Sequence, residues 1–251
     1  MSAEKTAILF FSHRPGREWQ NKQFVRRDYA KNRQVAEAFY QQARRTVEGS
    51  GLPVLEVNGP QQRGDDFGVR LANAFVDAFA QGYERVIAVG SDCPRLHEVN
   101  WSTVTDRLDD GRPVLGPTPE RDGTYLIGLH RSHFDTSTFA GLPWTTPDLF
   151  PALAQYLRNR AGIDPSLLAS RDDVNGHDDL LALLRSRVPV PVGLVGALRS
   201  VLGPASYRAW TESLPARAHF CGRRSRAPPS PPEAHSLSGV SSVNATPGRH
   251  R

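Results

Sequence analysis

Residues 85–94 read Arg-Val-Ile-Ala-Val-Gly-Ser-Asp-Cys-Pro, a short apolar run that ends in a polar turn. Apolar residues at successive positions are typical of a strand that is buried on both faces of a parallel sheet. Asp92 lies two residues beyond this run, on the turn that Pro94 interrupts. Because ligands of open α/β sheets bind at the carboxyl ends of the strands, Asp92 is a candidate site residue. It could equally cap the turn or helix that follows, so position alone leaves both interpretations open.

Short apolar runs alternate with longer helical patterns as far as residue 187. The expected strands cover residues 6–11, 53–58, 85–90, 113–115 and 124–130. The expected helices cover residues 24–48, 67–79, 99–108, 146–159 and 178–186. Strands that are separated by crossover helices predict a three-layer α/β sandwich with a mostly parallel sheet.

The positive charge of the chain is concentrated near its C-terminus. The chain has 31 Lys and Arg against 26 Asp and Glu, a formal net charge of +5, and residues 216–251 hold six Arg and one Glu. The rest is neutral, which argues against a nucleic-acid-binding domain. Residues 216–251 are also rich in Pro and Ser, as disordered segments are. We therefore expect an α/β domain at 1–187, an extension with helical potential at 188–215, and a disordered basic tail at 216–251.

Several other classes of protein are excluded by composition. Two cysteines, Cys93 and Cys221, are too few for a disulfide framework or a cysteine-based zinc site. The longest apolar run, residues 7–11, is far shorter than the roughly 20 residues that a membrane span needs. No signal-peptide pattern is present at the N-terminus. We expect a soluble, cytoplasmic protein with no membrane span and no nucleic-acid partner.

Two further segments carry candidate residues. In residues 61–71, Gly64 and Gly68 allow close backbone approach near a helix N-terminus, which attracts anions, and Arg70 lies off the apolar stripe. A capped surface helix with a solvated Arg explains the same pattern. Residues 116–129, Gly-Pro-Thr-Pro-Glu-Arg-Asp-Gly-Thr-Tyr-Leu-Ile-Gly-Leu, form a turn-rich loop before a buried strand. The pair Asp122-Gly123 within it is also an ordinary turn signal.

These segments, followed by Leu-Pro-Trp-Thr-Thr-Pro at 142–147 and Asp-Val-Asn at 173–175, together resemble one bacterial family. It is the GT-A-like glycosyltransferase family also called the radical-SAM/selenodomain-associated transferases. Its pattern runs Gly-Ser-Asp-x-Pro, Leu-Gly-Pro, Asp-Gly-Gly-Tyr-Tyr-Leu-Ile-Gly-Leu, Pro-Trp-Ser-Thr and Asp-Val-Asp. The similarity covers residues 7–184 and implies a nucleotide-diphospho-sugar transferase fold with Mg²⁺ or Mn²⁺ assistance.

The resemblance also implies roles for particular residues. The metal would be held by Asp92, Asp173 and Asn175, and Asp122 is the candidate catalytic acid or base. The residues expected to bind the nucleotide or the sugar are Arg14, Lys22, Gly64, Gly68, Arg70, Ser91, Gly123, Tyr125, Trp144 and Thr145.

The chain departs from the family pattern at two places. The basic loop Pro-Gly-x-x-Lys-Thr-Arg-Leu, which follows the first strand in the family, is absent, although Arg14, Arg17 and Lys22 could supply its charge. The last carboxylate of Asp-Val-Asp is replaced by the amide of Asn175, which offers an uncharged oxygen and so predicts weaker metal binding.

The leading hypothesis is a metal-dependent glycosyltransferase that uses a nucleotide-diphospho-sugar donor and an acceptor that the sequence does not identify. One alternative is a nucleotidyltransferase that acts on a nucleoside triphosphate, and another is a non-catalytic nucleotide-binding homologue. His130, His133 and Asp135 have the spacing of metal ligands but are interpreted as polar surface. Cys93 is interpreted as a packing residue.

Overall fold

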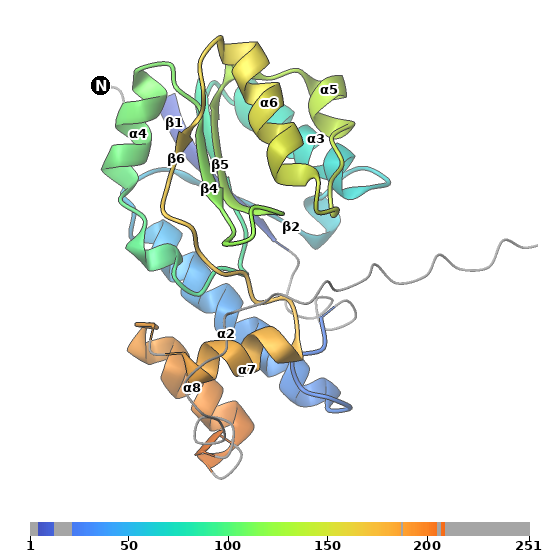
Figure 1. Ribbon diagram of the computed structural model, residues 1–251, viewed down its shortest axis with the longest axis vertical. Helices are drawn as coiled ribbons and strands as arrows, with labels where there is room; N and C mark the ends of the chain where they lie inside the picture. Colours follow the sequence, from blue (N-terminus) through green and yellow to red (C-terminus); the bar gives the residue numbers. More distant parts are fainter. Residues whose placement is uncertain (1–4, 13–21, 187, 205–206, 209–251) are drawn as a thin grey trace, which may run out of the picture.

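The computed structural model describes residues 5–12, 22–186, 188–204 and 207–208. Its centre is a six-stranded sheet with the order β2-β1-β3-β5-β4-β6 (Figure 1). The strands are β1 (Thr6–Ser12), β2 (Val54–Asn58), β3 (Arg85–Val89), β4 (Val114–Pro117), β5 (Thr124–His130) and β6 (Ser166–Leu167). Strand β5 runs antiparallel to both of its neighbours, and the other pairs are parallel. The predicted α/β fold with a mostly parallel sheet is confirmed.

Helices cover both faces of this sheet. The α-helices are α2 (Tyr29–Glu48), α3 (Phe67–Ala80), α4 (Trp101–Asp109), α5 (Thr136–Ala140), α6 (Leu149–Ala161), α7 (His177–Arg185) and α8 (Val192–Leu202). Short 3₁₀ helices lie at η2 (Gly59–Gln61), η3 (Leu96–Glu98) and η4 (Arg131–His133). Helices α3, α5 and α6 lie on one face, and α2 and α4 lie on the other (Figure 1).

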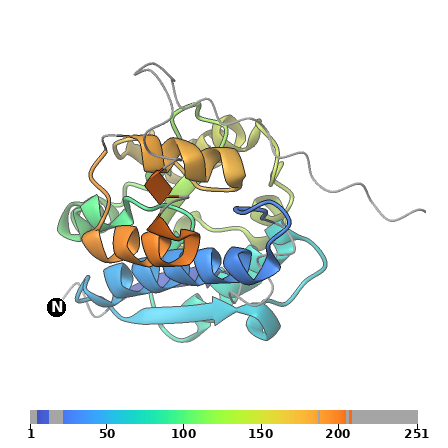
Figure 2. The ribbon, with the colours of Figure 1, turned by 90° about the horizontal axis from the view of Figure 1, so that it is seen from below.

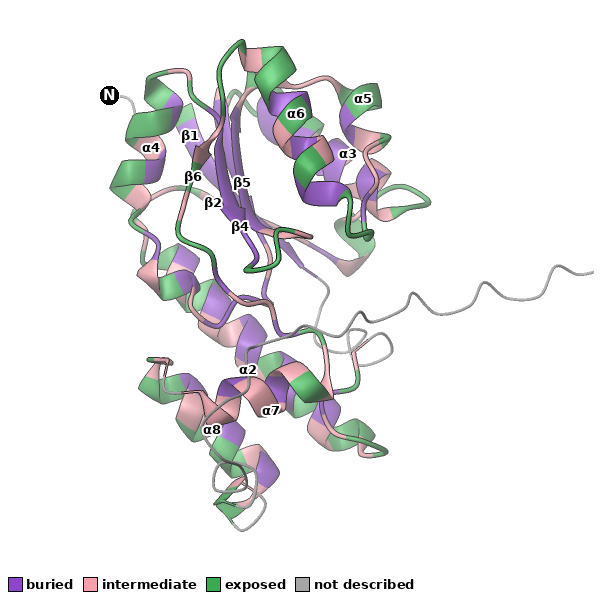
Figure 3. Cartoon of the chain, viewed as in Figure 1, coloured by how far each residue is buried: buried purple, intermediate pink, exposed green. Residues whose placement is uncertain are grey.

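Alternating strand residues build a separate core on each face. In β1, Leu9 and Phe11 pack with α3, α5 and α6, whereas Ile8 and Phe10 pack with α2 and α4. Because successive side chains of a strand point to opposite faces, one short apolar strand supplies both cores. Strands β1 and β3 are therefore buried along their whole length (Figure 3).

A third apolar cluster lies away from the sheet, where α2, α7 and α8 meet. Helix α8 runs along α2 (Figure 2), and Leu194, Leu198 and Leu202 are buried at this contact. The predicted extension at 188–215 thus contributes a helix that packs on the α/β body. The division of the chain into domains stays a prediction, and the predicted tail at 216–251 lies outside the described residues.

The N-terminal end of α2 differs from the prediction. The helix begins at Tyr29 instead of residue 24, because Asp28 caps it and accepts a hydrogen bond from the backbone N–H of Lys31 at 3.0 Å. The side chain of Asn32 bonds both the N–H and the C=O of Val25, at 2.7 and 2.8 Å, and holds that residue in a turn. Tyr29, the first residue of the helix, is 66% exposed.

Helix α6 also starts later than predicted, at Leu149 and not at residue 146. Thr145 has φ +64°, and the N–H of Thr146 bonds the carbonyl of Pro143, so a turn occupies the predicted first helical turn. Pro147 consequently precedes the helix. The sequence analysis also missed α5 and β6, which are five and two residues long and too short to show a periodic pattern.

Candidate functional site

A pocket of about 320 Å³ lies at the carboxyl ends of β1 and β3, beside the start of β5. Its lining includes seven of the residues that the sequence analysis singled out: Asp92, Gly123, Tyr125, Trp144, Thr145, Asp173 and Asn175. The rest of the lining is largely apolar and comes from β1, β3, β5, α3 and the start of α6. The pocket therefore has a carboxylate-bearing end and an apolar wall, at the sheet edge where α/β proteins bind ligands.

The carboxylate of Asp92, which follows β3, forms an ion pair with the ammonium of Lys22. The Lys22 side chain is 16% exposed and that of Asp92 is 32% exposed. The hydroxyl of Ser91 donates to Oδ1 of Asp92 at 3.2 Å. The sequence analysis assigned Lys22 to phosphate and Asp92 to a metal, but the structure brings these two side chains into direct contact.

Asp173 lies beside Asp92 because their backbones are joined. The N–H of Val174 donates to the carbonyl of Asp92 at 2.9 Å, which holds the segment that follows β6 against the loop that follows β3. Burial, followed by the negative charge of Asp92, raises the pKa of Asp173 to about 7, and Lys22 acts in the opposite direction. The polar end of the pocket thus has two carboxylates, and the Lys22 ammonium pairs with one of them from outside the lining.

This arrangement does not fit a resident divalent ion. Within the described ranges, no group of three or more His, Cys, Asp and Glu side chains is arranged to hold a metal. The donors in the pocket lining are the carboxylates of Asp92 and Asp173 and the amide of Asn175, and Mg²⁺ or Mn²⁺ would need water or substrate oxygens as its remaining ligands. The ammonium of Lys22 already contacts Asp92 and would repel a second cation. The Mg²⁺ or Mn²⁺ site stays a prediction without geometric support.

Aromatic side chains form the opposite wall. Trp144 is 9% exposed, its Nε1 donates to the carbonyl of Phe139 at 2.8 Å, and its ring lies 5.5 Å from that of Phe67. A Cβ on Gly68 would lie 2.3 Å from both the Trp144 ring and the carbonyl of Ala140. Gly68 therefore lets this wall pack against α3, and the group that approaches it closely is an indole and not a phosphate.

Thr145 has a strained backbone at the mouth of this wall. Its φ of +64° lies in the left-handed region, which a β-branched residue rarely adopts. Its hydroxyl donates to the carbonyl of Trp144 at 2.6 Å. Strain of this kind persists only where the surroundings enforce it, and it is concentrated at functional sites.

Six of the predicted residues that the structure describes are outside the pocket lining. Three of them contact residues of the lining: Lys22, Ser91 and Gly68. The other three are Asp122, Arg70 and Gly64. Asp122 accepts a hydrogen bond from the hydroxyl of Thr118 at 2.8 Å and is outside the lining. Arg70 donates to the carbonyls of Gly64 and Asp65, at 3.5 and 3.1 Å, and so bonds its own loop. Gly64, with φ +133°, serves the turn of that loop. Arg14 lies outside the described residues.

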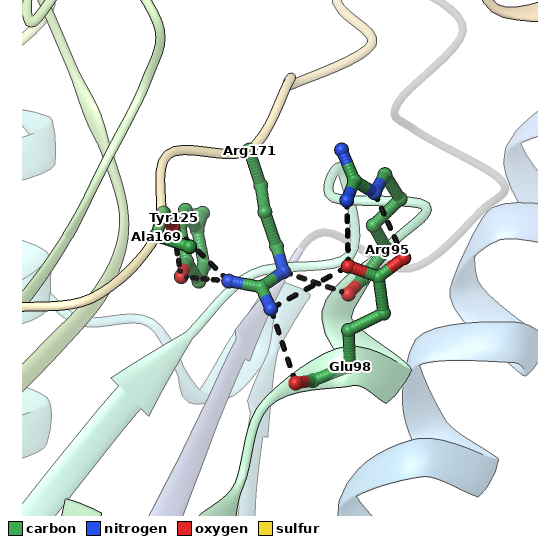
Figure 4. Close-up of polar contacts among 5 residues, drawn as sticks. All are labelled: Arg95, Glu98, Tyr125, Ala169 and Arg171. Carbon is green, nitrogen blue, oxygen red and sulfur yellow. Dashed lines mark hydrogen bonds and ion pairs between the residues drawn. The ribbon is translucent and has the colours of Figure 1, made fainter. Parts of the chain in front are cut away.

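The sequence analysis missed Arg171, which is 6% exposed. Figure 4 shows its polar contacts. Its guanidinium donates to the hydroxyl of Tyr125 at 2.6 Å and to the carbonyls of Ala169, Arg95 and Glu98 at 3.0, 3.1 and 3.0 Å. The carboxylate of Glu98 lies 3.6 Å away. These bonds tie the segment that leads to Asp173 to the turn that follows Asp92. Only the position of Arg171, two residues before Asp173, could have indicated this role.

Tyr125 belongs to the same hydrogen-bond network as Arg171. Its hydroxyl donates to the carbonyl of Ala169 at 2.9 Å and accepts from Arg171. Burial raises the pKa of Tyr125 to about 12. Its ring contributes to the pocket lining, but its polar atom is used to hold the segment that follows β6.

Cys93 and the histidine cluster match their structural interpretations. Cys93 is buried in the apolar core, and burial raises its thiol pKa well above the usual range, so the thiolate is disfavoured. Nδ1 of His130 lies 2.7 Å from the hydroxyl of Ser132, and Asp135 caps α5.

A second hollow, of about 740 Å³, lies between α2 and α8. Charged side chains of α2, those of Arg33, Glu37 and Arg45, line it together with small and apolar residues of α8. None of the predicted site residues that the structure describes lies in its lining. We refer to it as the α2–α8 groove.

Comparisons with known proteins agree with this description of the fold. Residues 26–146 match the model of a family described as uncharacterized proteins conserved in bacteria (DUF2064). The chain resembles a solved structure from Desulfovibrio desulfuricans G20, described as a "putative nucleotide-diphospho-sugar transferase". The TM-score is 0.63 and the identity 23%, over 82% of this chain and 98% of that one. No curated protein is significantly similar to the chain. In the part of the chain that the structure describes, no helix is long and apolar enough to cross a membrane.

Proposed function

We propose that this chain is a nucleotide-diphospho-sugar transferase whose donor binds in the pocket at the ends of β1, β3 and β5. The observation that carries the proposal is the convergence of four separate segments, around Asp92, Gly123, Trp144 and Asp173, on one pocket at the ligand-binding edge of the sheet. A fold shared with a protein described in those terms supports it.

The shape and chemistry of the pocket suit the reacting part of such a donor. Its volume of about 320 Å³ is near the lower end for small-molecule sites, so it would hold the sugar and the adjoining phosphate and leave the base outside. The aromatic wall at Trp144 offers an apolar surface to the C–H face of a sugar ring. The carboxylates of Asp92 and Asp173 can accept hydrogen bonds from sugar hydroxyls.

In the proposed reaction, an acceptor hydroxyl attacks the anomeric carbon while the bond from that carbon to the diphosphate oxygen breaks. The hydroxyl proton passes to a carboxylate and the electron pair leaves with the diphosphate. Asp173 is better placed than Asp122 to receive this proton, because Asp173 lines the pocket and Asp122 does not. No step is assigned to a divalent metal, since the described residues do not fit one.

A thermal-shift panel tests the proposal, because a ligand that binds only the folded state raises the melting temperature. The panel contains nucleoside diphosphates, nucleoside triphosphates and nucleotide-diphospho-sugars, with turnover of each diphospho-sugar measured in parallel. The proposal predicts the largest shift with a diphospho-sugar and release of its nucleoside diphosphate. Preference for a triphosphate would instead favour a nucleotidyltransferase, and binding without turnover would favour a non-catalytic homologue.

A further inference from the structure

Lys22 has an unusual position for a lysine. Its ammonium forms an ion pair with Asp92, and its positive charge opposes the rise that burial causes in the pKa values of Asp173 and Asp179. Three carboxylates from two distant segments thus face one ammonium. Two of these carboxylates, those of Asp92 and Asp173, line the pocket.

This position is where a cation would be expected to neutralise a bound diphosphate. Asp92 and Asp173 are the two charged ligands of the predicted metal site, and the third, Asn175, carries no charge. A metal ion could bind there only after it displaced the ammonium from Asp92, because two cations at one carboxylate repel each other. The amide of Asn175, where the family pattern has a carboxylate, makes the site less negative and so weakens its attraction for a divalent ion.

We propose that the ammonium of Lys22 takes the place of a divalent ion, so that this protein binds the diphosphate of its donor without a metal. This inference rests on the proposed function and identifies the group that recognises the donor's phosphates. The Lys22 Nζ is buried against Asp92, outside the pocket lining, so a diphosphate oxygen reaches it by taking the place of one contact at the ammonium. Because an ammonium has three N–H donors, Lys22 can bind that oxygen while it keeps one bond to Asp92. As the bond between the anomeric carbon and the diphosphate breaks, the charge that develops on the departing oxygen is stabilised by the same ammonium.

The test uses the full chain and inorganic pyrophosphate, a probe that carries the diphosphate without a base or a sugar. Melting temperature and calorimetric affinity are measured in EDTA and in Mn²⁺ for the wild type, Lys22→Met and Lys22→Arg. Lys31→Met is the matched control, since Lys31 is exposed at the start of α2 and faces Asp28. Circular dichroism and melting of each unliganded variant establish that it is folded, and Lys22→Arg keeps the charge if Lys22→Met is poorly folded.

The expected result is binding of pyrophosphate by the wild type in EDTA, weakened roughly 10- to 100-fold in Lys22→Met and unchanged in Lys31→Met. Lys22→Arg should retain most of the affinity, because the positive charge remains. Electron paramagnetic resonance should detect little bound Mn²⁺ in the unliganded wild type and more in Lys22→Met, where the competing ammonium is gone.

Two outcomes would overturn the inference alone. They are pyrophosphate binding by the wild type only when Mn²⁺ is present, and undiminished binding by folded Lys22→Met in EDTA. In either case a nucleotide-diphospho-sugar would still bind, and the proposed function would stand with a metal or another cation. If the wild type bound neither pyrophosphate nor any nucleotide, with or without Mn²⁺, both the inference and the proposed function would fail.

Discussion

Two positively charged side chains contact the segment that follows β3, and they are held in different ways. Arg171 donates to three backbone carbonyls and a tyrosine hydroxyl, and the carboxylate that it pairs with, that of Glu98 at 3.6 Å, is outside the pocket lining (Figure 4). Lys22 instead pairs with Asp92, a carboxylate that lines the pocket. Both side chains are largely buried, so burial does not distinguish them. Burial alone therefore does not show whether a cation stabilises the fold or binds a ligand. The partners of the cation distinguish these two roles.

The largest effect is expected for Arg171→Met. This change removes the four hydrogen bonds that the buried guanidinium donates, although the carbonyls of Ala169 and Arg95 keep other donors. It should lower the free energy of unfolding by about 3–5 kcal/mol in urea denaturation. Lys22→Met should cost less, about 1.5–3 kcal/mol, because it removes one charged contact, whose Asp92 partner is 32% exposed. A larger loss of stability for Lys22→Met than for Arg171→Met would break the comparison.

Arg158→Met provides the control for Arg171→Met. Arg158 pairs with Asp164 on the surface, where both side chains are more than half exposed. Its loss should change the free energy of unfolding by less than about 1 kcal/mol.

A smaller effect of opposite sign is expected for Asp173→Asn. Burial raises the pKa of Asp173 to about 7 in the folded protein, so the folded state binds more protons than the unfolded state and the wild type loses stability as the pH rises from about 4 to about 7. Asp173→Asn should therefore be more stable than the wild type at pH 8, by roughly 1–2 kcal/mol, with a smaller difference at pH 5. Chemical denaturation at the two pH values measures both.

The same variant tests the proposed proton acceptor. Turnover of the diphospho-sugar should fall roughly 100-fold in Asp173→Asn, as expected for loss of a general base. Asp122→Asn is the matched control, and its turnover should stay within about tenfold of the wild type because Asp122 is outside the pocket. Undiminished turnover in Asp173→Asn with a large loss in Asp122→Asn would return the catalytic assignment to Asp122.

The smallest effect concerns the strained residue at the mouth of the pocket. Thr145→Gly relieves a left-handed conformation that costs a β-branched residue about 1–2 kcal/mol. Part of this gain in stability is lost, because glycine also increases the conformational entropy of the unfolded chain. The free energy of unfolding should stay equal or rise by up to about 1 kcal/mol. Thr103→Gly, in helix α4, is the control and should lower it by about 0.5–1 kcal/mol. A loss in Thr145→Gly as large as in the control would remove the evidence for strain.

Local patterns were sufficient to predict much of the fold. The apolar runs that became β1, β3 and β5 were identified because strands buried on both faces are apolar at successive positions. The reversed direction of β5 was not predicted, since strand direction depends on pairing with β3 and β4 and leaves no mark on the strand's own sequence.

The candidate site was predicted one residue at a time but not as an arrangement. Asp92 and Asp173 were identified by motif, and the structure brings them together through the bond from Val174 to Asp92. The pairing of Lys22 with Asp92 joins residues far apart in the chain, and no local pattern encodes it. Arg171 was missed for the same reason, because its distant partners lie in two other segments, the turn at Arg95 and Glu98 and strand β5.

The most direct test of the donor site is a crystal structure of the full chain with the nucleotide-diphospho-sugar that the thermal-shift panel selects, grown in EDTA. The account predicts the sugar between Asp173 and Trp144, with a diphosphate oxygen within hydrogen-bond distance of the Lys22 ammonium. A donor bound in the α2–α8 groove, or a diphosphate that makes no contact with the segment following β3, would contradict it.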